Sequence, residues 1–120
     1  MPCDVLLVED DNRIAELVET TLQDEGYGVT IAASATEAFA HLATQSVDVI
    51  LFDLRMRGMD GREFYALIRE RGIRAPAILV SAWSEVESVA RSMDVPFLRK
   101  PFELDELVEV VRVACIPQQS

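Results

Sequence analysis

The strongest constraint on the fold is a set of short apolar runs that each stop at a polar or charged residue. Runs of four apolar residues with β-branched members are typical of strands buried on both faces of a parallel sheet. They are too short for the helices of a packed domain. We therefore predict a parallel strand in each of four segments: Val5–Val8, Val49–Phe52, Ala77–Val80 and Val95–Leu98.

The segments between these runs have helical character. Ile14, Leu17, Val18 and Leu22 recur at helical spacing before Gly26, which predicts one apolar helix face, and Asp11 or Asn12 can cap this helix. Residues 27–32 alternate as a further strand. Ser34 with Glu37, and Ser84 with Glu87, fit the capping box that opens a helix. The chain thus reads as five strand–helix units, which predicts an α/β fold with a parallel sheet covered by helices on both faces.

Composition limits what such a domain can do. At 120 residues, half of them hydrophobic, the chain is long enough for one domain with a substantial core. The net charge of −10 disfavours nucleic acid as a partner, and no apolar run has the roughly 20 residues of a membrane helix. The start has no signal-peptide pattern, so we expect a cytoplasmic protein without a membrane partner. In that reducing compartment Cys3 and Cys115 are expected to be packing thiols.

Polar groups follow four of the predicted strands, and parallel strands bring their carboxyl ends to one edge of a sheet. Glu9 and Asp10 follow the first run, Asp53 the central one, and Ser81 and Lys100 the last two. Individually each could be an ordinary turn or helix-start residue. Together they form a plausible set for phosphoryl transfer to an aspartate: carboxylates for Mg²⁺, a lysine and a hydroxyl to neutralise phosphoryl oxygens, and a carboxylate nucleophile.

These residues carry a resemblance over nearly the whole chain. The matching motifs are Leu6-Leu7-Val8-Glu9-Asp10-Asp11, Asp53-Leu54 with Gly58-Met59-Asp60-Gly61, Ser81-Ala82, and Lys100-Pro101-Phe102. In these motifs the chain resembles the receiver domain of response regulators. The resemblance implies a flavodoxin-like, three-layer fold of five strand–helix units, with the parallel sheet in the order 2-1-3-4-5.

The same resemblance implies roles for individual residues. Asp53 would accept a phosphoryl group from a histidine kinase or a histidine phosphotransfer protein, with Ser81 and Lys100 binding that group. Mg²⁺ would be held by Glu9, Asp10, Asp53 and the backbone carbonyl of Arg55. Phe97, three residues before the lysine, matches the aromatic switch position.

Three features depart from the family pattern. Arg57 stands where the family usually has proline, in the loop that we expect from Leu54 to Gly61. Trp83 is bulky beside the site, at a position that influences acyl-phosphate lifetime in the family, and we expect it to shield the phosphoryl group from water. The interval from Ser81 to Lys100 is shorter than usual, which predicts a short or weakly ordered fourth helix.

The sequence therefore predicts a receiver domain over residues 1–116 and a tail or linker start over 117–120. Its expected function is that of a phosphoaccepting, Mg²⁺-dependent element of a phosphorelay, which switches the binding of a downstream protein and is not an enzyme. Two alternatives stay open: a receiver-like module that works without phosphate, and an aspartyl-nucleophile phosphatase. Such phosphatases carry a second aspartate two residues after the nucleophile, where this chain has Arg55.

Overall fold

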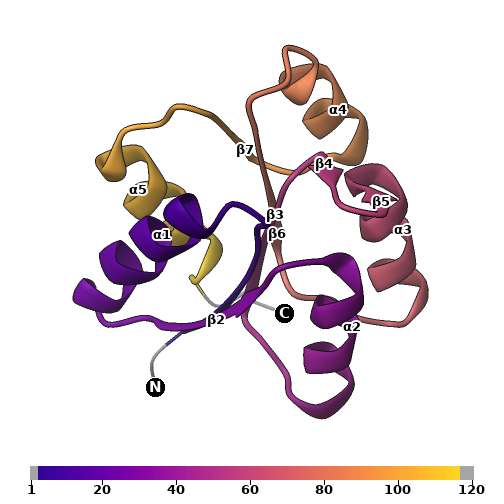
Figure 1. Cartoon of the computed structure of the whole chain (residues 1–120), viewed down its shortest axis with the longest axis horizontal. Helices are drawn as coiled ribbons and strands as arrows, with labels where there is room; N and C mark the ends of the chain where they lie inside the picture. Colours follow the sequence, from indigo (N-terminus) through magenta and orange to yellow (C-terminus); the bar gives the residue numbers. More distant parts are fainter. Residues whose placement is uncertain (1–2, 117–120) are drawn as a thin grey trace.

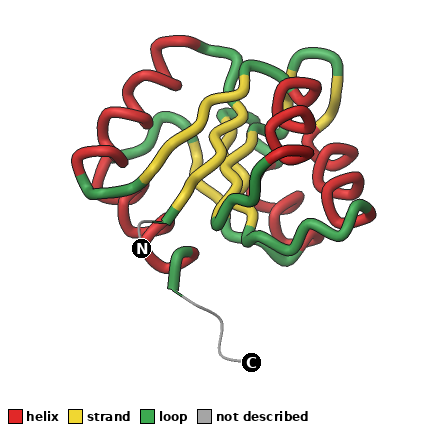
Figure 2. The backbone as a smooth tube through the Cα atoms, turned by 90° about the horizontal axis from the view of Figure 1, so that it is seen from below, coloured by secondary structure: helices red, strands yellow, loops and turns green. Residues whose placement is uncertain are grey.

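The main sheet is parallel and lies between two layers of helices (Figures 1 and 2). The computed structural model describes residues 3–116, so the predicted tail over 117–120 lies outside the described residues. The strand order is β2-β1-β3-β6-β7. Numbered among themselves along the chain, these five strands have the order 2-1-3-4-5, which confirms the flavodoxin-like order. The strands are β1 (Asp4–Val8), β2 (Gly28–Ala32), β3 (Val49–Phe52), β6 (Ala77–Ser81) and β7 (Phe97–Arg99).

Alternation along the strands divides the core into two halves. Leu6, Ile50 and Phe52 point to one face, where α2, α3 and α4 pack; Leu7 and Leu51 point to the other, which α1 and α5 cover. Figure 1 shows α1 and α5 together on one side of the sheet. Each such fully buried side chain contributes about 1.5–3 kcal/mol. The helices are α1 (Asn12–Asp24), α2 (Ala35–Thr44), α3 (Gly61–Glu70), α4 (Val86–Met93) and α5 (Leu104–Ala114).

Two of the three predicted helix caps are present in the structure. The Asp11 carboxylate caps α1 by accepting from the backbone N–H of Arg13 and Ile14, and the Ser34 hydroxyl caps α2. The predicted box at Ser84 is wrong. A turn in which the Val86 N–H donates to the Trp83 carbonyl moves the helix start to Val86, beyond the reach of a Ser84 cap.

The fourth helix is short, as predicted. It has eight residues, and Asp94 ends it in the left-handed region with φ 56°. The Val95 N–H then donates to the Ala90 carbonyl, so Val95 closes this helix. For that reason β7 begins at Phe97 rather than at Val95.

The loop expected after Asp53 has structure of its own. Arg55–Met56 (β4) and Met59–Asp60 (β5) pair as a small antiparallel hairpin. Gly58 makes its turn with φ +82°, a conformation that L side chains rarely adopt. The loop that the sequence predicted thus contains a short hairpin, which the sequence did not indicate.

The two cysteines are joined, contrary to the prediction of separate packing thiols. Cys3 and Cys115 form a disulfide with Cα atoms 6.1 Å apart, across a sequence separation of 112 residues. Cys3 directly precedes β1, and Cys115 is the C-cap of α5. The parallel fold brings these two points together, which no local pattern in the sequence could indicate.

None of the helices within residues 3–116 combines the length and the hydropathy that a membrane span requires.

Gly61 allows α3 to begin directly against the backbone that follows β3. Its N–H donates to the Leu54 carbonyl at 2.6 Å. A Cβ at this position would lie 2.6 Å from the carbonyl oxygen of Asp53 and 2.8 Å from the Cα of Leu54. Both are backbone atoms, so this contact cannot be relieved by a side-chain rotation.

We predict that Gly61→Ala lowers the free energy of unfolding by about 1–3 kcal/mol, the usual cost of overpacking. Urea denaturation measures this change. Gly72→Ala is the matched control, since a Cβ there meets nothing within 4 Å and the cost comes only from its φ of +81°. Equal stability of wild type and Gly61→Ala would show that the backbone next to Asp53 moves freely, against this prediction.

Candidate functional site

Four of the predicted site residues meet at the carboxyl edge of the sheet. The register pairs Val8 with Phe52 and Phe52 with Leu79, so Glu9 and Asp53 each follow directly after paired residues. Ser81 is paired with Arg99, next to Lys100. Ligands of open α/β sheets bind outside this edge. The strand register thus explains why these residues lie together.

Lys100 is the centre of the site. Its Nζ donates to Glu9 Oε1 and to Asp53 Oδ2, each at 2.8 Å. The exposed fractions of the three side chains are low, 13% for Lys100, 3% for Glu9 and 13% for Asp53. The Lys100 N–H also donates to the Ser81 carbonyl at 2.9 Å. One ammonium group therefore compensates two carboxylates in a largely dry setting.

Burial and charge act in opposite directions on these groups. Burial raises the pKa of Glu9 above its ordinary value, and Lys100 offsets this only in part. For Lys100, burial alone would lower the pKa, but the hydrogen bonds and charges of Asp53 and Glu9 outweigh it and hold the pKa above its ordinary value. The lysine is therefore charged at neutral pH. The charged form of Glu9, by contrast, is disfavoured by its burial.

The remaining acceptors of the two carboxylates bind backbone. Asp53 Oδ1 accepts from the Arg55 N–H at 3.1 Å, and Glu9 Oε2 accepts from the Asp11 N–H at 3.2 Å. These bonds fix both side chains from two directions. Ser81 is fully buried, and its hydroxyl oxygen accepts from the Trp83 N–H at 3.2 Å.

Asp10 does not join this group in the way that the sequence suggested. It is exposed, and no cluster of three or more His, Cys, Asp or Glu side chains suited to a metal occurs within residues 3–116. The structure brings together two carboxylates, Glu9 and Asp53, rather than three. The role of Asp10 stays a prediction.

The donor set nevertheless fits Mg²⁺. This ion takes oxygen ligands, is usually bound by one or two carboxylates and keeps several waters. Glu9 and Asp53 supply two such carboxylates that already share one cation, Lys100. The hairpin places Arg55 two residues after Asp53, so its carbonyl belongs to the same segment.

The side chain of Arg55 is a feature that the sequence analysis missed. Its guanidinium carbon lies 4.3 Å from the ring centroid of Trp83, and its Nη2 lies 3.5 Å from Glu85 Oε1. This stack joins the hairpin after β3 to the turn after β6. Trp83 is 46% exposed, so it lies at the rim of the site. No short-range pattern in the sequence signals a pair 28 residues apart.

An apolar groove of about 360 Å³ adjoins the lysine. Leu17 on its wall is 48% exposed, although the helical pattern suggested that it is part of the core. The full lining is Ile14, Leu17, Ala82, Lys100, Pro101 and Phe102.

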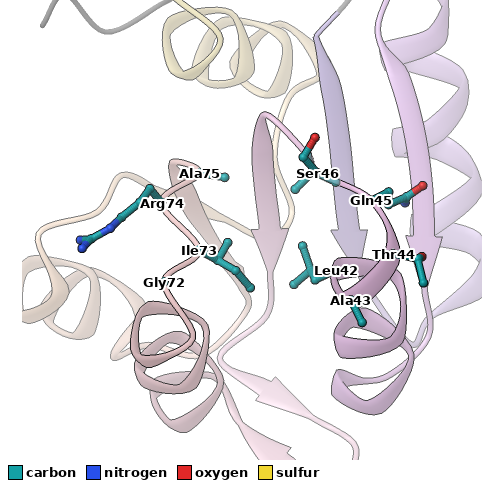
Figure 3. Close-up of a pocket in the computed structure, with 10 residues that line it drawn as sticks. Leu42, Ala43, Thr44, Gln45, Ser46, Gly72, Ile73, Arg74 and Ala75 are labelled. Carbon is teal, nitrogen blue, oxygen red and sulfur yellow. The ribbon is translucent and has the colours of Figure 1, made fainter.

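A second hollow, of about 490 Å³, lies at the opposite end of the sheet. It is formed by residues 42–47, at the end of α2 and the start of the loop to β3, and residues 72–75, between α3 and β6. Figure 3 shows the Leu42 and Ile73 side chains turned toward one another and Arg74 directed away. It contains none of the predicted site residues, so we assign the functional site to the edge that carries Asp53.

Comparison with known proteins agrees with this geometry. Residues 5–112 match the family model of the response regulator receiver domain. The transcriptional regulatory protein YkoG of Bacillus subtilis is 31% identical over 113 residues, covering 92% of this chain and 50% of the relative. The DNA-binding transcriptional regulator NtrC of Salmonella typhimurium is 34% identical over 92% of this chain and 24% of the relative. The chain thus spans half or less of these relatives.

Solved structures give the same result. The receiver domain of the Francisella response regulator 1452 has a TM-score of 0.85 at 30% identity, covering 94% of this chain and 96% of that one. The response regulator TrrA of Thermotoga maritima, in complex with Mg²⁺ and BeF, has a TM-score of 0.84 at 32% identity, covering 93% and 98%. Sequence motifs, sheet order and site geometry therefore lead to one conclusion: this chain belongs to the response regulator receiver domains of two-component systems.

Proposed function

We propose that Asp53 accepts a phosphoryl group from a phosphohistidine of a histidine kinase or histidine phosphotransfer protein. The observation that supports this most directly is the Lys100 ammonium, which is 2.8 Å from the Asp53 carboxylate inside a largely buried site. A carboxylate held beside a charged lysine at the carboxyl edge of a parallel sheet is suited to receive a group that brings negative charge with it.

In the proposed step an Asp53 carboxylate oxygen attacks phosphorus. The phosphorus–nitrogen bond of the donor breaks, its electron pair stays on the imidazole, and an acyl phosphate forms on Asp53. As negative charge moves from the Asp53 carboxylate to the phosphoryl oxygens, Lys100 would pair with those oxygens. The buried Ser81 hydroxyl would provide a hydrogen-bond donor on the neighbouring strand. We propose a signalling role and no enzymatic one, because the acyl phosphate on Asp53 is itself the product of the transfer.

We propose that Mg²⁺ assists this transfer, with Glu9, Asp10, Asp53 and the Arg55 carbonyl as its ligands. When bound, the ion would supply charge neutralisation at the transferring phosphoryl oxygens. Glu9 and Asp53 already face one cation, and TrrA, a structural relative, was solved with Mg²⁺ and BeF. Asp10 is exposed beside Glu9 and would add the third carboxylate.

The apolar groove supports a protein as the phosphodonor. Its lining includes Lys100 together with the exposed Leu17, so a partner that covers the groove also reaches the mouth of the site. Acidic residues dominate the nearby helices, among them Glu16 and Glu19 on α1 and Asp105 and Glu106 on α5. We therefore propose an apolar helix flanked by basic residues as the donor surface.

We propose the cytoplasm as the compartment of this protein, because ATP-dependent kinases supply phosphohistidines there.

The output would pass through Ser81 and Phe97. Phe97 is the first residue of β7, pairs with Leu79 of β6 and packs partly buried against the core on the α4 side. A change in the position of Ser81 on β6 could therefore shift Phe97 and bias a two-state equilibrium. The downstream partner would be a protein that binds the switched face.

Two other functions have less support. An aspartyl phosphatase needs an acid two residues after its nucleophile, but Arg55 is at this position and its side chain stacks on Trp83. A module that works without phosphate would not need a charged lysine shared by two buried carboxylates, which costs desolvation.

The first prediction from this function concerns Asp53. Incubation with acetyl phosphate and Mg²⁺ should raise the intact mass by one phosphoryl group, and Asp53→Asn should abolish the gain, because an amide lacks the nucleophilic carboxylate. Asp60→Asn is a matched control outside the Lys100 cluster and should retain the gain. No gain in folded wild type, with either acetyl phosphate or its kinase, would favour the phosphate-independent module.

The second prediction concerns stability at Glu9. Because its pKa is raised, the folded state binds this proton more tightly than the unfolded chain. Ionised Glu9 therefore costs stability as pH rises from its ordinary value of 4.5 through the folded pKa. We predict that Glu9→Gln raises the free energy of unfolding at pH 7 relative to wild type, with an advantage that shrinks toward pH 4.

Urea denaturation from pH 4 to pH 7 measures this difference. Asp10→Asn, which removes the exposed neighbouring carboxylate, should change stability little over the same range. An unfolding free energy of Glu9→Gln that falls below wild type most strongly at pH 7 would contradict the assigned direction.

The third prediction concerns the rim. If Trp83, held by Arg55, excludes water from the acyl phosphate, Trp83→Ala should shorten the phosphate half-life severalfold. Arg55→Ala should have a smaller effect in the same direction, because it removes only the support. Loss of radiolabel from phosphorylated protein measures the half-life, with Arg57→Ala as the control in the same hairpin. An unchanged half-life in Trp83→Ala would exclude the shielding role.

A further inference from the structure

The Cys3–Cys115 disulfide lies at the end of the sheet opposite to Asp53. Cys3 precedes β1, whose other end leads to Glu9, and its carbonyl accepts from the Gly28 N–H at 3.1 Å. This bond anchors Cys3 to the sheet. The disulfide therefore connects a fixed point of the sheet to the last turn of α5.

Apart from the disulfide, the last turn of α5 contacts the core through the partly buried side chain of Ala114. Leu107 and Val111 are fully buried against the sheet, but Val113 is 52% exposed. The ion pair of Arg112 with Glu109 lies within the helix surface and does not attach it to the core. Beyond Val111, the attachments of this helix end within residues 3–116 are the partial packing of Ala114 against the core and the covalent link at Cys115.

We propose that Cys3 and Cys115 form a thiol–disulfide exchange site for small thiols and disulfides of the glutathione type. Its redox state would control whether the C-terminal turn of α5 is fixed to the sheet. This input acts at the opposite end of the domain from the phosphoryl site and is independent of the proposed phosphorylation.

The small disulfide is the oxidant in the proposed exchange. In the dithiol state, one protein thiolate attacks a small disulfide, forms a mixed disulfide and releases one small thiol. The second protein thiolate then attacks the protein sulfur and releases the other, so the small disulfide is reduced as the protein pair is oxidised. Both cysteines are partly exposed, so a small reagent can reach them. The chain has two cysteines in all, so no third thiol competes.

The test compares folded wild type in oxidised and in reduced glutathione buffers. Alkylation followed by intact mass should find no reactive thiol in the first and two in the second. Hydrogen exchange should be at least about tenfold faster for amides 111–115 after reduction, because the constraint on the helix end is lost. Amides of β3 serve as the internal reference and should keep their protection.

Single variants separate the chemistry from a general loss of stability. Cys115→Ser and Cys3→Ser should each gain one glutathione on the remaining cysteine and show the fast α5 exchange of the reduced protein. Asp53→Asn should behave like wild type, so failure of the phosphoryl proposal leaves this result unaffected. Two alkylatable thiols in oxidised buffer, or equal α5 exchange in both buffers, would overturn the proposal. If the single variants fail to fold, the two wild-type states decide.

Discussion

The shared ammonium group of Lys100 is the interaction on which the site depends. Glu9 and Asp53 come from neighbouring strands and are nearly excluded from water, and two carboxylates a few ångströms apart repel each other strongly in such a setting. One lysine at 2.8 Å from both makes their proximity tolerable. The raised pKa of Glu9 shows that the compensation is incomplete. The proposed Mg²⁺ would add positive charge that this pair of carboxylates lacks.

The parallel sheet makes this arrangement possible. Lys100 is 91 residues from Glu9 and 47 from Asp53 in sequence, and only strands that run in the same direction bring all three to one edge. The same geometry collects the opposite ends of the chain at the other edge, where Cys3 meets Cys115. The domain thus has a charged site at one end and a covalent clasp at the other, with a dry two-sided core between them.

The rim of the site depends on contacts outside the Lys100 cluster. Gly61 lets α3 begin against the backbone of Asp53, and the hairpin that precedes it positions Arg55. The Arg55 side chain then reaches Trp83, which follows a different strand. Exposed stacks of this kind are worth about 0.5–1 kcal/mol, too little to shape the fold but enough to bias a side chain at the entrance.

The sequence by itself determined the fold class, because buried strands and helix faces leave local periodic patterns. It also predicted that Glu9, Asp53, Ser81 and Lys100 meet at one edge of the sheet, because each follows a strand. The strand order came from the resemblance to a family. The sequence also indicated the short α4. The tertiary structure alone decided that Asp10 stays apart, that Leu17 lines a groove, that Arg55 stacks on Trp83 and that the cysteines pair. Each of these outcomes depends on how segments distant in sequence lie against one another, which is set by register and packing rather than by any local pattern of residues.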